Sequence, residues 1–205
     1  EPFVVNPALR IIKTGDWNPH FQIYPGGFIY LQTLAASASA VQMAGTGELA
    51  YTTDLRSGLE TKYLWTISHP KVYLFGRFLA ALLGALTTVV VWRIGHLVYG
   101  PTAGVVSGFL LAFSPLAVAL STIIGTDNPA TLFMMLAVLA SVSIQSERPP
   151  RLAYLAAGVS VGIAIGMKYN AGIVLLVVLL AHLLTPRAQR KLRDLAVVLA
   201  AMTGA

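Results

Sequence analysis

Residues 73–97 read YLFGRFLAALLGALTTVVVWRIGHL, and the only Asp, Glu, Lys or Arg among them are Arg77 near the start and Arg93 near the end. The stretch is long enough to cross a membrane, which takes about 20 mostly apolar residues. The whole chain of 205 residues has the same character, since 56% are hydrophobic and 11% are charged. A soluble domain carries about 25% charged residues. The sequence therefore predicts an all-α polytopic membrane protein.

Similar apolar segments follow on the C-terminal side of this stretch. A kink is expected at Ser114-Pro115, which a membrane helix tolerates when its neighbours satisfy the freed backbone groups. Together with residues 73–97, these segments predict about five to six transmembrane helices. They are residues 103–124, 129–144, 152–167, 171–184 and a segment that begins near Leu195.

On the N-terminal side, residues 1–70 are predicted to form an outer segment with interfacial helices, before a transmembrane domain over residues 71–205. Within it, GDWNPHFQIYPGGFIYLQ (residues 15–32) is apolar but is interrupted by proline and glycine, which break helices. Residues 28–44 leave two alternatives. Their Ser, Thr and Gln side chains favour a helix lying in the outer membrane interface. A full span would instead place residues 1–16 and 45–71 on opposite sides.

Positive charges near the helix ends predict the orientation of the chain. Lys and Arg gather at one set of helix ends, whereas the short loops at the other ends hold only Lys168. The positive-inside rule makes the first side cytoplasmic and places residues 1–70 outside the cytoplasmic (plasma) membrane. The net charge of +6 then reflects topology and not nucleic-acid binding. The Lys and Arg residues counted at the cytoplasmic helix ends are Arg93, Arg148, Arg151, Arg187, Arg190, Lys191 and Arg193.

The chain starts at Glu1 without a methionine or a basic leader and stops inside an apolar run, so we expect a piece of a longer membrane protein, truncated at its C-terminus. It has no cysteine, which excludes a disulfide framework, a thiolate metal site and a cysteine nucleophile.

Asp127 stands between charge-free runs over residues 94–126 and 128–146, at the outer mouth of a predicted helical hairpin. An ionisable group near membrane depth is costly and is a functional candidate. The alternative is structural, because Asp127 followed by Asn and Pro is also favourable turn and N-cap chemistry.

Lys168 and Arg77 are the cations closest to this outer side. Each either extends its charge from a helix end into the interface or binds a phosphate group. A metal site built from outer-face acids and histidines is a weaker hypothesis, because no metal-binding spacing supports it. Its members would be Glu1, Asp16, His20 and His69.

The order of these motifs resembles that of a known family. After an acidic residue come GDWNPHF and YPGGFIYL, then FGRFLAALLGAL, a Ser-Pro span, TDNP and MKYNAG. This order is similar to the N-terminal half of GT-C type glycosyltransferases that use polyprenyl-phosphate sugars, the protein mannosyltransferase and aminoarabinose transferase group. Each motif is short, so the resemblance rests on their order and on the topology, over most of the chain.

In that family the outer segment opens with an Asp-Glu pair after a first transmembrane helix. Glu1 matches the Glu, whereas the Asp and that helix would precede this chain, and Pro25-Gly26 stands where the family often has Pro-Pro. The resemblance implies catalytic roles for Glu1 and Asp127 and substrate-binding roles for Lys168, Tyr169 and Arg77. His20 and Tyr24, on the broken outer stretch, are further candidates to line a lipid-donor pocket.

The implied reaction is transfer of a sugar, with inversion, from a polyprenyl-phosphate lipid at the outer leaflet to an acceptor hydroxyl. An outer-loop carboxylate would act as general base, and Lys168 and Arg77 would stabilise the phosphate. A divalent metal ion could share that role. The implied partners are the lipid donor, membrane lipids and an acceptor that the sequence does not identify.

Two other functions remain as alternatives. A non-catalytic membrane subunit of a larger complex would keep the scaffold without the Asp of the pair. A transporter is disfavoured, because no ionisable residue stands at the centre of a predicted span.

Overall fold

The structure is a computed structural model that describes residues 1–21, 23–56, 69–145, 151–186 and 192–204. These residues form helices joined by turns and loops, which confirms the all-α prediction. The N-terminal unit, residues 1–56, contains α1 (Pro2–Thr14), α2 (Gly27–Gly45) and the 3-10 helix η1 (Thr52–Asp54). The helical bundle contains α3 (Pro70–Tyr99), α4 (Pro101–Ala112), α5 (Pro115–Ser121), α6 (Asp127–Ile144), α7 (Arg151–Met167), η2 (Tyr169–Val174), α8 (Leu175–Leu184) and α9 (Leu192–Thr203).

Each apolar segment found in the sequence forms a helix or a pair of helices. Residues 103–124 become α4 and α5, which meet at an angle of 60° around the expected kink. Helix α6 begins at Asp127, so Pro129 is its third residue and not its first. By length and hydropathy, α3 and α6 are each able to cross a membrane, and the bent α4–α5 pair would be a third span. Helix α7 and the η2–α8 segment are shorter and apolar.

Helix α2 is not among the described helices that are long and apolar enough to cross a membrane. Most of the orientation count falls outside the described residues, because it rests on Arg148, Arg187, Arg190 and Lys191. The division at residue 70 stays a prediction. Helix α3 begins there, but Val72 and Tyr73 in its first turn share a buried hydrophobic cluster with residues of α1 and α2.

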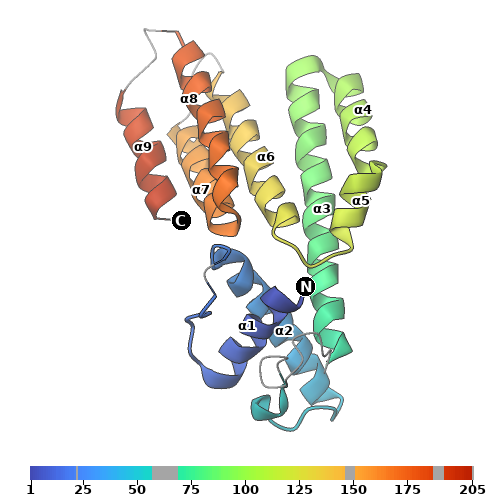
Figure 1. The fold of residues 1–205 in the computed structure, drawn as a ribbon. Helices are drawn as coiled ribbons and strands as arrows, with labels where there is room; N and C mark the ends of the chain where they lie inside the picture. Colours follow the sequence, from blue (N-terminus) through green and yellow to red (C-terminus); the bar gives the residue numbers. More distant parts are fainter. Residues whose placement is uncertain (22, 57–68, 146–150, 187–191, 205) are drawn as a thin grey trace.

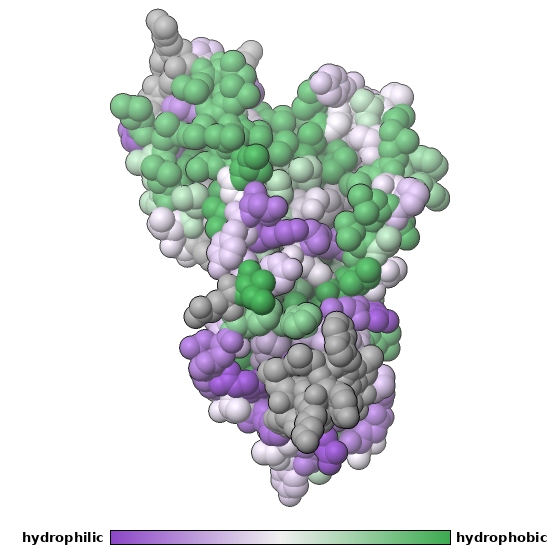
Figure 2. Space-filling view, in the orientation of Figure 1, coloured by the Kyte–Doolittle hydropathy of each residue, from purple (hydrophilic) through white to green (hydrophobic). Residues whose placement is uncertain are grey.

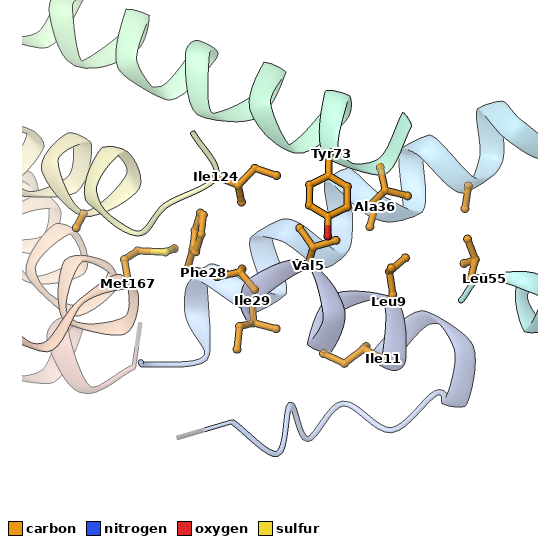
Figure 3. Packing of buried hydrophobic residues seen from close by; sticks show 14 of the residues in the cluster. Val5, Leu9, Ile11, Phe28, Ile29, Ala36, Leu55, Tyr73, Ile124 and Met167 are labelled. Atoms are coloured by element: carbon orange, nitrogen blue, oxygen red, sulfur yellow. The ribbon is translucent and has the colours of Figure 1, made fainter. Parts of the chain in front are cut away.

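The N-terminal unit lies at the lower end of the bundle in Figure 1, beside the connection between α5 and α6 and the turn between α7 and η2. One buried hydrophobic cluster joins the two parts. In it, Tyr73 of α3 lies among Val5 of α1 and Ala36 of α2, and Ile124 and Met167 extend the cluster into the bundle (Figure 3). Hydrophobic residues cover most of the visible bundle surface in Figure 2, whereas hydrophilic residues gather on the N-terminal unit.

The sequence predicts interfacial helices within residues 1–70 but does not place one over α1, which contains two prolines. Pro2 stands at the start of the helix, where its missing N–H removes no hydrogen bond. Pro7 lies inside the helix and does remove one. Burial of Val5, Leu9 and Ile11 outweighs that cost, since each large apolar side chain gains about 1.5–3 kcal/mol on burial.

The start of α2 packs directly against the end of α7. A Cβ atom added to Gly27 would lie 2.5 Å from the carbonyl oxygen of Gly166, much closer than atoms can approach. Gly27, the second glycine of the Tyr-Pro-Gly-Gly stretch, is therefore required by this contact between the N-terminal unit and the bundle.

Replacing Gly27 by alanine is expected to destabilise the protein by about 1–3 kcal/mol, because the backbone of α7 has to move away. Thermal unfolding of the full-length protein in detergent measures the effect. Gly45→Ala at the other end of α2 is the matched control, since no atom lies within 4 Å of the added carbon. Equal stabilities of the two variants would contradict this account of the contact.

Candidate active site

The first residue of α6, Asp127, forms an ion pair with Lys168. Lys168 Nζ donates to Asp127 Oδ1 at 2.5 Å. Lys168 stands where α7 ends and η2 begins, so the pair joins two connections on the same side of the bundle. The side chain of Asp127 is 45% exposed and that of Lys168 is 32% exposed. Both groups are therefore open to a ligand arriving from that side.

A second pair links Glu1, the residue that caps α1, to Arg77 on α3. Arg77 Nε donates to Glu1 Oε1 at 2.9 Å, and Nη2 donates to Oε2 at 2.7 Å. The backbone N–H of Ile124 also donates to Glu1 Oε1, at 3.1 Å. Glu1 is thus fixed by three donors from two elements, and its side chain is only 15% exposed.

The side-chain hydrogen bonds from Arg77 lower the pKa of Glu1 below its ordinary value, and the Ile124 N–H acts in the same direction. Partial burial opposes this shift, but it does not reverse it. A carboxylate with a lowered pKa accepts a proton less readily. The geometry therefore suits Glu1 to hold the α5–α6 connection in place, and its catalytic role stays a prediction.

Asn128 positions the start of α6, a role that the sequence did not reveal. Its Nδ2 lies within hydrogen-bond distance of the carbonyl oxygens of Ala80 and Leu120, at 3.2 and 3.1 Å. The Ser121 hydroxyl is 3.4 Å away. Asn128 is buried and follows Asp127 directly, so these contacts with α3 and α5 also orient the acid. The Asp-Asn-Pro motif was the only sequence signal of this role.

The remaining candidates contact other partners. His20 Nε2 lies 3.0 Å from Asp16 Oδ2. The ring of Tyr24 lies beside that of Phe21, with centroids 6.2 Å apart. Tyr169 is the neighbour of Lys168 in the chain, and its side chain is largely exposed. Substrate-binding roles for His20, Tyr24 and Tyr169 stay predictions.

The described residues form no cluster that is arranged to bind a metal ion. Across the described ranges, no group of three or more His, Cys, Asp or Glu side chains is placed to hold an ion. Glu1 and Asp127 each bind a cationic side chain, Asp16 pairs with His20, and His69 accepts a backbone N–H. No reaction step is therefore assigned to a metal ion.

The family model described as dolichyl-phosphate-mannose-protein mannosyltransferase matches residues 71–205, which is more than half of the chain. The match includes Arg77, Asp127 and Lys168, and the segment that carries Glu1 lies outside it. No curated protein and no solved structure matches the chain. The chain thus belongs to the dolichyl-phosphate-mannose-protein mannosyltransferase family, a family of membrane glycosyltransferases of the GT-C type.

Proposed function

We propose that this protein transfers a sugar from a polyprenyl-phosphate lipid to an acceptor hydroxyl at the outer face of the membrane. The observation that carries the proposal is the position of Asp127 and Lys168, half-exposed and in contact at one end of apolar helices. The second acid–cation pair, Glu1 and Arg77, is joined to the first by the α5–α6 connection. This end is the one that the charge distribution predicts to lie outside.

Lys168 and Arg77 would bind the phosphate of the donor. Lys168 offers a point charge and Arg77 a planar set of donors, both of which suit phosphate oxygens. Each cation is held by a carboxylate before the donor arrives. A phosphate that binds Lys168 competes with Asp127 for the ammonium group, and it thereby releases the carboxylate for catalysis.

The released Asp127 carboxylate would act as general base. It takes the proton of the acceptor hydroxyl while the hydroxyl oxygen attacks the anomeric carbon of the sugar. The bond between that carbon and the phosphate oxygen breaks, the configuration inverts, and polyprenyl phosphate leaves with one additional negative charge. Lys168 and Arg77 stabilise that developing charge, which is where fixed cations contribute most.

The test is sugar transfer by the full-length protein in vesicles. Polyprenyl-phosphate mannose should support transfer to an impermeant acceptor on the outer side. A nucleoside diphosphate mannose should not. Transfer from the nucleotide sugar, or only from the cytoplasmic side, would contradict the proposal. Absence of transfer from either donor would favour the non-catalytic subunit.

A further inference from the structure

A cavity lies in the N-terminal unit, between α1 and the segment that follows it. Its volume is about 360 Å³, and none of the residues that form the two ion pairs of the candidate site lines it. One wall comes from α1 and the other from residues 19–21. The lining includes Phe3, Asn6, Arg10, Pro19, His20 and Phe21.

The wall formed by residues 19–21 is held in place by Asp16. Arg10 Nη2 donates to Asp16 Oδ2 at 2.9 Å, and the backbone N–H of Asn18 donates to Oδ1 at 3.0 Å. His20 Nε2 lies 3.0 Å from Asp16 Oδ2, and His20 has a φ of 49°, a conformation uncommon for residues other than glycine. The cavity is therefore organised before a ligand binds.

The lining combines flat aromatic faces with polar side chains. The rings of Phe3 and Phe21 are stacked, with centroids 6.4 Å apart and planes 26° from parallel. Arg10, Asn6 and His20 supply polar atoms beside them. The electron-rich face of an aromatic ring attracts the C–H groups of a sugar ring, while polar side chains bind its hydroxyls. The lining thus suits a pyranose ring.

An extended peptide is a poorer match to this wall. A peptide that adds to a backbone edge needs free main-chain donors. Here the N–H groups of Asp16, Asn18 and His20 already donate to side chains of the same segment. Recognition must therefore come from side chains, which favours a small ring-shaped ligand.

The cavity runs along α1 from the first residues of the helix. Phe3 is two residues from Glu1, and Arg10 lies about 10 Å further along α1 at 1.5 Å per residue. The cavity therefore begins at the end of α1 that carries the Glu1–Arg77 pair, and it continues along the helix to Arg10. We infer that this cavity is a carbohydrate-binding subsite for the acceptor, a role that rests on the proposed transferase function.

Kinetics of the full-length protein test the inference with Phe21→Ala. Loss of the ring face should raise KM for a carbohydrate acceptor about tenfold, the equivalent of about 1.4 kcal/mol, and leave KM for the lipid donor unchanged. Phe109→Ala in α4 is the matched control, because Phe109 also pairs with another phenylalanine ring but does not line the cavity. If Phe21→Ala does not fold, Phe3→Leu provides the same test, because it removes a ring from the cavity but keeps an apolar side chain.

Saturation-transfer NMR with a panel of methyl glycosides tests binding without catalysis. At least one glycoside should receive magnetisation from the wild type and from Phe109→Ala, but not from Phe21→Ala. This measurement separates the two proposals, since binding without any sugar transfer would support the subsite and contradict the transferase. Absence of glycoside binding, a change in donor KM instead of acceptor KM, or competition by peptides alone would overturn the inference.

Discussion

Asp127→Asn in the full-length protein is expected to lower kcat for sugar transfer about 10²–10⁴-fold, the range that a positioned general base contributes. Asparagine has nearly the same shape as aspartate, and the N-cap of α6 is Thr126, so the helix should still begin at this residue. It cannot take the proton of an acceptor hydroxyl. Initial rates with a polyprenyl-phosphate sugar measure the effect.

Glu48→Gln is the matched control for this prediction. Glu48 also binds a lysine, Lys71, but the pair lies away from Asp127 and Lys168 at the N-terminal side of α3. Its loss should leave kcat within about twofold, because solvent screens an exposed ion pair. Unchanged transfer by Asp127→Asn would exclude a catalytic role for Asp127. The residue would then have only a structural role at the start of α6.

The second large effect concerns the pair between Glu1 and Arg77. Glu1→Gln and Arg77→Gln are each expected to destabilise the full-length protein by about 1.5–3 kcal/mol, as hydrogen bonds to charged groups do. The double variant should lose less free energy of unfolding than the two single variants lose together, because both single changes remove the same hydrogen bonds. Chemical unfolding in detergent measures all four proteins. Strict additivity would show that the pair contributes little.

The same pair predicts a dependence of stability on pH. Since Arg77 lowers the pKa of Glu1 in the folded state, the pair contributes its full stability above the unfolded value of about 4.3. That contribution is lost as the pH falls through the lower, folded value. Unfolding temperatures across this acidic window should therefore fall more steeply for the wild type than for Glu1→Gln. Parallel curves would contradict the assignment.

The pattern of apolar segments was enough to predict most of the helices. Their lengths follow from composition and from breakers such as Ser114-Pro115, both of which are local properties. The acid at the start of α6 and the lysine after α7 were also visible, because each interrupts a long charge-free run. Helix α1 was missed, since its stability depends on burial against α2 and α3, which local propensity does not report.

The sequence by itself thus determined the all-α membrane class, the positions of the breaks and the identity of the charged residues near the helix ends. Only the tertiary structure decided which charges meet. It joined Glu1 to Arg77 across 76 residues and Asp127 to Lys168 across 41. It also brought Gly27 against Gly166, where a side chain would not fit. The Glu1 and Gly27 contacts depend on how α1 and α2 pack beneath the bundle, whereas the Asp127–Lys168 contact depends on how α6 packs against α7. Packing between distant segments leaves no periodic signal in the chain.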